Sequence, residues 1–214
     1  MKPLIIVILL FTFSLGLSQE YDDPIYHGNE YGGGVTIAMS GFGFGGFYRW
    51  ALPNYSHIGV NANFYVMRDD NQFTYYDPYY TYYPIEVNNY NRLFIIPIAF
   101  EYKKRFFTNT VADGTRPYFI ASSGFTFGMN FPRDPNEIFT TTSEAELAGY
   151  PTENEYQFTY NATVGFGVDI TTQKDFYISL RPQYRFMRFT KSIAGKKDHS
   201  NFEILIEIGK RSIR

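Results

Sequence analysis

Apolar and polar residues alternate with a period of two along most of the chain after residue 30. In the segment 158–170, Phe, Tyr, Ala, Val and Ile occupy the even positions, and Thr, Asn, Gly and Asp occupy the odd ones. This alternation is typical of a strand with one apolar and one polar face. The same period marks the segments 58–66, 94–102, 119–129, 176–186 and 202–208. We therefore predict an all-β fold.

The segment 35–50 also alternates, but its apolar residues change from odd to even positions in the middle. The residues concerned are Val35, Ile37, Met39, Phe42, Phe44, Tyr48 and Trp50. A β-hairpin with a two-residue turn at Ser40-Gly41 explains the change, because Met39 then opposes Phe42 and opposed residues share a face. One long strand with a β-bulge near Gly41 also explains it. The hairpin brings the total to eight strands and the bulged strand to seven. The sequence leaves both open.

The connections between the predicted strands alternate in length. Long links at 69–91, 130–155 and 190–200 fall on one side of the sheet, and shorter links fall on the other. This arrangement is typical of transmembrane β-barrels, which usually have an even number of strands. The polar faces are mostly Gly, Ser, Thr and Asn, which suit the narrow interior of an eight-stranded barrel. We predict an antiparallel up-and-down transmembrane β-barrel of eight strands. A soluble secreted sandwich or lipocalin-like barrel is the alternative.

The first 18 residues have the features of a secretory signal peptide. Lys2 precedes an apolar run at 4–13, and small residues at Gly16 and Ser18 place cleavage before Gln19. The apolar run is too short to span a bilayer. We predict a signal peptide at 1–18, a periplasmic N-terminal segment at 19–30 and an outer-membrane barrel domain at 31–214. The expected location is the outer membrane of a Gram-negative bacterium.

Composition adds three constraints. The chain contains no cysteine, so neither disulfides nor a lipoprotein anchor are expected. Its net charge of −2 argues against a nucleic-acid partner. Its 22 Phe, 20 Tyr and 18 Gly favour β-structure with close backbone approaches.

A few charged residues of both signs, Lys103 among them, lie on the predicted polar faces. We expect them to form a structural polar network in the lumen: Glu101, Asp169, Arg181, Arg185, Glu203 and Glu207. The competing interpretation is a narrow pore lined by the two arginines.

The link at 69–91 contains a tyrosine-rich run. Because tyrosine combines apolar area with a polar tip, the run suits contact with a protein or a glycan at the cell surface. The residues are Tyr75, Tyr76, Tyr79, Tyr80, Tyr82 and Tyr83. A self-packed loop is the alternative. The link at 130–155 is acidic, which suits either divalent-ion contact with lipopolysaccharide or simple solubility.

No pattern in the chain points to catalysis, and we predict no enzymatic activity and no catalytic, cofactor-binding or metal-binding residues. His199 lies near the outer end of the last strand, where some lipid A-modifying barrels carry a histidine, but no orienting acid is identifiable. His57 is expected to be a hydrogen-bonded filler on the polar face. The run 68–71, RDDN, lacks the spacing and the closing Glu of a calcium loop.

Several strands resemble those of the small outer-membrane β-barrels of Bacteroidota, the porin family or outer-membrane-protein β-barrel domain group, with the shape of the OmpX and OmpW types. The similar pieces are LFIIPIAFEY, RPYFIASSGFTFG and ATVGFGVDI followed by FYISLRPQYRF. The resemblance covers nearly the whole mature chain. Two features depart from the usual pattern: the chain ends IGKRSIR rather than in an aromatic residue, and Pro97 predicts a bulge in its strand.

The resemblance implies a structural or surface-interaction role without catalysis. The expected partners are outer-membrane lipid, lipopolysaccharide and the outer-membrane assembly machinery, with an unknown protein or glycan at the tyrosine-rich run. Alternative functions are a small solute pore, a PorT-like component of a secretion system and, more remotely, a lipid A-modifying enzyme.

Overall fold

The computed structural model describes residues 28–68, 73–76, 84–87, 91–106, 115–133, 153–172 and 175–212. Its strands are β1 (Asn29–Ala38), β2 (Gly41–Leu52), β3 (Ser56–Met67), β4 (Phe73–Tyr76), β5 (Pro84–Val87), β6 (Leu93–Arg105), β7 (Thr115–Asn130), β8 (Glu155–Thr171), β9 (Phe176–Ile193), β10 (Lys196–Asp198) and β11 (Asn201–Ser212). No helix in these residues is long and apolar enough to cross a membrane.

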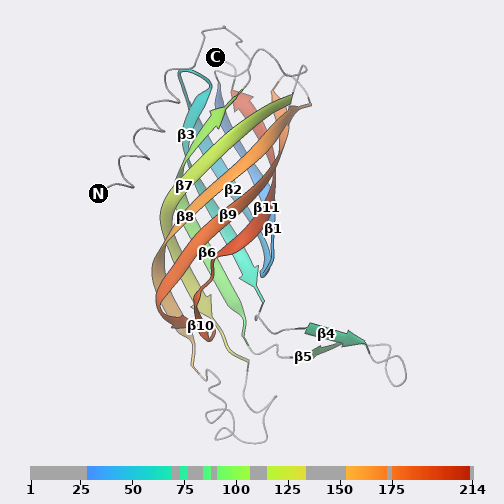
Figure 1. Cartoon of the computed structure of the whole chain (residues 1–214), viewed down its shortest axis with the longest axis vertical. Coiled ribbons are helices and arrows are strands. Elements are labelled where there is room, and N and C mark those ends of the chain that lie inside the picture. Colours follow the sequence, from blue (N-terminus) through green and yellow to red (C-terminus); the bar gives the residue numbers. More distant parts are fainter. Residues whose placement is uncertain are drawn as a thin grey trace, which may run out of the picture.

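Eight of the strands form a closed antiparallel barrel (Figure 1). The order around the wall is β1, β2, β3, β6, β7, β8, β9 and β11, and β11 pairs back with β1. Short β10 also pairs with β9, while β4 and β5 form a separate two-stranded sheet. The predicted all-β, up-and-down, eight-stranded architecture is confirmed. Strand β1 begins at Asn29, two residues before the predicted start of the barrel domain.

The two ends of the barrel differ in the elements they carry. At the upper end in Figure 1, β1 begins and β11 ends. At the lower end, the turns Met39-Ser40 and Ala194-Gly195 connect strands, and β7, β8 and β9 extend further down than β1 and β2.

The pairing register shows that the strands are staggered. Starting from Glu30, the successive paired residues are Arg49, Gly59, Glu101, Ser122, Thr163, Arg185 and Asn201. Glu203, two residues after Asn201, pairs with Ala38 of β1. Extending this antiparallel register by two residues sets Asn201 opposite Ser40. One circuit of the wall therefore ends ten residues beyond Glu30, where it began. A closed barrel with such a stagger has tilted strands. The stagger brings inward side chains from distant parts of the sequence around one lumen.

The segment 35–50 is a hairpin. β1 and β2 pair over nine residue pairs, from Glu30 opposite Arg49 to Ala38 opposite Gly41. The predicted turn position is wrong by one residue, because the turn is Met39-Ser40 and Ile37, not Met39, opposes Phe42. The register therefore shifts by two residues, which keeps every side chain on its predicted face.

Gly41 begins β2 and does not have the positive φ that often explains a glycine next to a turn. A Cβ atom there would collide with the carbonyl oxygen of Val66 on the paired strand β3. Close approach of two backbones, rather than a left-handed conformation, therefore explains this glycine.

Two further expectations are wrong. The link 190–200 is mostly strand: β9 continues to Ile193, and Ala194 and Gly195 form the turn with φ values of 49° and 82°. Positive φ at both central residues is what a type I′ hairpin turn requires. Pro97 causes no bulge, since β6 keeps one register against both β3 and β7 on either side of it.

Side chains on the wall are distributed oppositely to those of a soluble protein. Large apolar residues on every barrel strand point outward and are exposed, for example Ile37, Phe44, Ile58, Phe100, Phe125, Phe166, Leu180 and Ile206. Near the upper end, Tyr48 stacks on Tyr31 and meets Trp50 edge-on. Charged residues lie inside, many of them less than 5% exposed. The soluble sandwich or lipocalin-like alternative does not fit this distribution.

Candidate functional site

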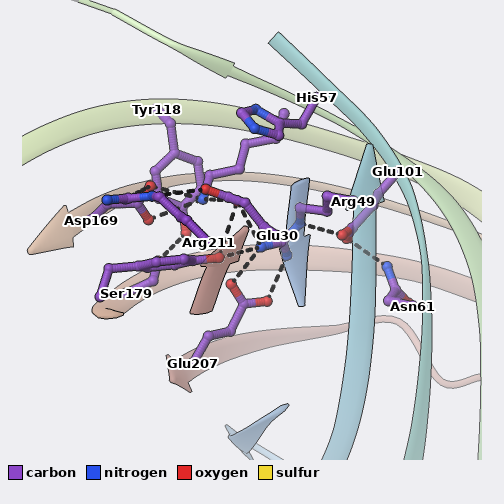
Figure 2. A network of polar contacts seen from close by, with 12 residues as sticks. Glu30, Arg49, His57, Asn61, Glu101, Tyr118, Asp169, Ser179, Glu207 and Arg211 are labelled. Atoms are coloured by element: carbon purple, nitrogen blue, oxygen red, sulfur yellow. Dashed lines mark hydrogen bonds and ion pairs between the residues drawn. The ribbon is translucent and has the colours of Figure 1, made fainter. Parts of the chain in front are cut away.

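The upper half of the lumen is filled by charged side chains (Figure 2). We call them the ionic network: Glu30, Arg49, Glu101, Lys103, Arg105, Asp169, Arg181, Glu207 and Arg211. The alternation of each strand points these side chains inward, and burial in a narrow barrel forces opposite charges together.

Glu30 on β1 is a centre of this network and is fully buried. Its carboxylate is paired with Arg105, and Lys103 Nζ lies 3.4 Å from Oε2. Arg211 Nε lies 3.3 Å from Oε1, and the hydroxyl of Tyr177 donates to Oε2 at 3.0 Å. Four groups from three other strands therefore hold one carboxylate.

Asp169 on β8 is the second acceptor for the same cations. Arg105 donates from Nε and Nη2 to Oδ2 at 2.8 and 2.6 Å. Lys103 Nζ lies 2.8 Å from Oδ2. Lys103 also lies over the rings of Tyr118 and Tyr177, 4.2 and 5.0 Å from their centroids. Both cations thus have carboxylate partners within the protein, and Lys103 also has aromatic ones.

Arg49 on β2 connects two more carboxylates. Its Nη2 and Nη1 donate to the two oxygens of Glu207 at 2.8 and 3.2 Å. Its Nε donates to Glu101 Oε1 at 2.5 Å, and Asn61 donates to the other oxygen of Glu101 at 2.7 Å. The guanidinium carbon lies 3.8 Å from the ring centroid of Phe47.

A smaller polar group lies further towards the lower end. Arg185 pairs with Glu203, with Nε 2.8 Å from Oε1, and its Nη2 donates to the Tyr65 hydroxyl at 2.6 Å. Gln183 also donates to Glu203, at 2.7 Å. Strands β3, β9 and β11 are thereby joined across the lumen.

Two tyrosines fill the lumen because their paired residues are glycines. Tyr118 opposes Gly167, and Tyr177 opposes Gly209. A Cβ atom on either glycine would collide with the facing tyrosine ring. The glycines therefore provide the space in which the rings pack beside Lys103.

The lower end of the lumen is closed by apolar side chains. We call them the outer cap, because the predicted periplasmic segment 19–30 leads into the opposite, upper end. They come from β3, β6 and β9: Tyr65, Met67, Leu93, Ile95, Met187, Phe189 and Ile193. Gly128 on β7 lies beneath Phe189 and Ile193, where a larger residue would be crowded. The cap and the ionic network together occlude the lumen from both ends.

A small cavity of about 20 Å³ remains between the ionic network and the smaller polar group around Arg185. It is lined by polar side chains from β3, β6, β7, β8, β9 and β11, among them Asn61, Glu101, Ser122, Thr163, Arg181 and Glu207. A volume of roughly 10–15 Å³ accommodates one water molecule, so the cavity is large enough for at least one group of that size.

All six predicted lumen residues are buried inside the barrel. Glu101, Asp169, Arg181 and Glu207 belong to the ionic network, whereas Arg185 and Glu203 form the smaller group. Lys103, expected on the same polar face, also belongs to the ionic network. The structure adds Glu30, Arg49, Arg105 and Arg211, which were not among the predicted lumen charges. Glu30, Arg105 and Arg211 lie just beyond the predicted strand ends, and extending the alternation by a few residues finds them.

The predicted tyrosine contact surface cannot be placed. Tyr75 and Tyr76 lie on β4, of which only the backbone is described. Tyr79, Tyr80, Tyr82 and Tyr83 lie outside the described residues.

The two described histidines are buried. His57 Nε2 lies 3.2 Å from the carbonyl oxygen of Gly28, and Nδ1 lies 3.3 Å from Arg105 Nη1. His199 packs edge-on against Phe189, and its Nε2 lies 3.2 Å from the carbonyl oxygen of Ile193. In the described part of the chain, no group of three or more His, Asp or Glu side chains is arranged to hold a metal ion.

The chain matches no known protein-family model and no curated protein sequence. Solved structures nevertheless share its fold. The outer membrane protein OprG from Pseudomonas aeruginosa has a TM-score of 0.52 at 9% identity, over 90% of this chain and 100% of that one. The N-terminal β-barrel domain of Pseudomonas aeruginosa OprF has a TM-score of 0.50 at 11% identity, over 87% and 98% of the two chains.

Neisserial surface protein A, NspA, is similar to the same degree. Its TM-score is 0.50 at 12% identity, over 87% of this chain and 96% of that one. The fold is therefore that of the small eight-stranded outer-membrane β-barrels.

Proposed function

We propose that the protein is an integral β-barrel of the outer membrane of a Gram-negative bacterium, exported by a signal peptide at 1–18. Its role is structural or surface-interacting, without catalysis. One observation carries the proposal: the outer wall is apolar on all eight strands, while the interior holds the charges. Soluble proteins rarely expose apolar patches larger than a few hundred Å². In a lipid environment these apolar side chains are not exposed to water. The closed barrel also leaves no wall strand without a hydrogen-bonded neighbour on either side.

The filled lumen favours a scaffold over a solute pore. Ion pairs connect β1, β2, β6, β8, β9 and β11 across the interior, and the outer cap closes the lower end. Such a barrel fixes the positions of the lower ends of its strands. The connections that join those strand ends include the tyrosine-rich run and the acidic segment 134–152. We propose that they contact lipopolysaccharide and an unidentified protein or glycan.

We further propose that the protein belongs to the Bacteroidota-type porin family. The strand segments on which the resemblance rests lie in β6, β7, β8 and β9 of the barrel. No described contact favours the secretion-system role or lipid A modification.

Fractionation of the full chain, expressed in a Gram-negative host, tests the location. We expect the protein in the detergent-extracted outer membrane, migrating faster in gel electrophoresis when unheated than when boiled. A soluble periplasmic marker and a known outer-membrane barrel serve as the two controls. A monodisperse protein released with the periplasmic marker would contradict the proposal.

A further inference from the structure

The outward face of β9 changes from apolar to basic at Arg188. From the upper to the lower end, its outward residues run from Phe176 to Phe186 without a charge, and Tyr184 meets Phe186 edge-on. The run Phe176–Phe186 covers 11 residues, and a transmembrane strand needs about 9–11. Arg188 is the next outward residue and is exposed. In the proposed outer-membrane location, Arg188 therefore lies where hydrocarbon meets the headgroups of the outer leaflet.

The backbone at Arg188 is held from both sides. Arg188 opposes Asp198 of β10, and the Thr159 hydroxyl of β8 donates to the Arg188 carbonyl oxygen at 2.5 Å. The carboxylate of Asp198 accepts the backbone N–H of Ser200 at 2.9 Å. Among the described residues, no side chain lies within hydrogen-bond or ion-pair distance of the Arg188 guanidinium. A fixed backbone thus presents a cation that can take an external partner.

Two lysines add to the positive charge of this hairpin. Lys191 precedes and Lys197 follows the turn from β9 to β10, and both are exposed. Neither side chain forms a hydrogen bond or an ion pair within the described part of the chain. Glu155 of β8 approaches the turn, but its Oε2 already accepts the N–H of Ala194 and an amide hydrogen of Asn130. We call these three residues the rim cations: Arg188, Lys191 and Lys197.

We propose that the rim cations bind a phosphate group of lipid A in the outer leaflet. The inference deepens the lipopolysaccharide contact proposed above and rests on the outer-membrane location. Arginine and lysine form charge-assisted hydrogen bonds with phosphate oxygens, and basic clusters beside a membrane attract anionic headgroups. The same wall offers Phe186 to the acyl chains, one outward position above Arg188. Because this surface joins cations directly to an apolar wall, it fits a lipid phosphate better than a free phosphate.

Native mass spectrometry of the full chain, refolded in detergent, tests the site by comparing lipid A that carries its phosphates with lipid A stripped of them. The wild type should bind the phosphorylated form more tightly. Arg188→Gln should weaken that binding about fivefold, which is the effect of one basic residue near an anionic lipid surface. Binding of the stripped form should not change. Arg188→Lys keeps the charge and should bind the phosphorylated form nearly as well as the wild type.

Lys210→Gln is the matched control. Lys210 is the first charged outward residue after Ile208 on β11, at the upper end of the barrel. In detergent both ends are equally accessible, so a general attraction between cations and phosphate would act on Lys210 as well. We expect Lys210→Gln to bind phosphorylated lipid A like the wild type. An equal loss of binding in Arg188→Gln and Lys210→Gln would overturn the proposal.

Folding and location are checked separately from binding. Arg188→Gln should keep the difference in electrophoretic mobility between unheated and boiled samples, because Arg188 is exposed. A protein that fails the fractionation test contradicts the outer-membrane location. A protein that passes it but binds both forms of lipid A equally well contradicts only the site at the rim cations.

Discussion

The guanidinium of Arg49 meets the carboxylate of Glu207 end-on, through both Nη atoms, with nitrogen–oxygen distances of 2.8 and 3.2 Å, although the two residues are 158 positions apart in sequence. Arg49 is on β2 and Glu207 on β11, so β1 lies between their strands in the wall. The pair therefore bridges over β1 on the lumen side and does not join two neighbouring strands. It links the first hairpin of the barrel to the last strand.

Removing the charge of Glu207 should be strongly destabilising. Glu207→Gln leaves Arg49 and Arg181 buried with fewer carboxylate contacts, and a broken buried ion pair costs about 3–5 kcal/mol. Urea unfolding in lipid vesicles, followed by the fluorescence of the single tryptophan, Trp50, measures the free energy of unfolding. The control Lys197→Gln changes an exposed charge and should stay within about 0.5 kcal/mol of the wild type. If both variants matched the wild type, the network would not contribute to stability.

A charge on the outer wall should be costly if that wall faces lipid. Phe166 is 65% exposed on β8. Phe166→Arg should lose roughly 2–4 kcal/mol in the same vesicle assay, as charges do near the bilayer midplane of barrels. Phe166→Leu keeps an apolar side chain and serves as the matched control. An arginine variant as stable as the leucine variant would show that this face does not meet hydrocarbon.

The glycine opposite Tyr118 should not tolerate a side chain. A Cβ atom on Gly167 would collide with the Tyr118 ring, whose hydroxyl lies 2.5 Å from Ser179 Oγ. We expect Gly167→Ala to destabilise the barrel by about 1–3 kcal/mol, because the ring must move. Gly195→Asn provides the comparison, since that position has space around it and asparagine tolerates its φ of 82°. Similar stabilities for the two variants would contradict the proposed packing.

The two ends of the barrel should differ in their accessibility from outside the cell. Met39 lies in the lower-end turn and is 84% exposed, whereas Pro53 lies in the short upper-end turn between β2 and β3. The chain has no cysteine, so Met39→Cys and Pro53→Cys each introduce a single thiol. A membrane-impermeant maleimide should label position 39 in intact cells and position 53 only after the outer membrane is permeabilised. The reverse result would invert the orientation.

Alternation predicts the faces of the strands reliably because it is a local property. Phe166 and Thr163 were assigned to opposite faces from period two alone, and the structure places them outside and inside. Turn positions are less certain: a two-residue shift in the register of β1 against β2 leaves every face unchanged, so the sequence pattern cannot distinguish the two registers.

The partners in the lumen depend on information that a local pattern does not contain. Whether Arg49 meets Glu207 is decided by the stagger accumulated around all eight strands. The residue at which a strand ends is also hard to predict from the local pattern, because it too depends on partners from other strands. Arg105 resembles part of a polar loop, yet it continues β6 because Asp169 and Glu30 neutralise it inside the barrel. Likewise, the polar run 196–198 resembles a loop but pairs with β9.

Single-channel recording on the purified protein in planar bilayers tests the central claim most directly, namely a membrane-spanning barrel with an occluded lumen. Insertion is checked first in vesicles of the same lipid by the difference in electrophoretic mobility between unheated and boiled samples. We predict that the inserted wild type shows no discrete conductance steps, because the ionic network and the outer cap fill the lumen. Stable, reproducible steps from the wild type would contradict this account and favour a solute pore.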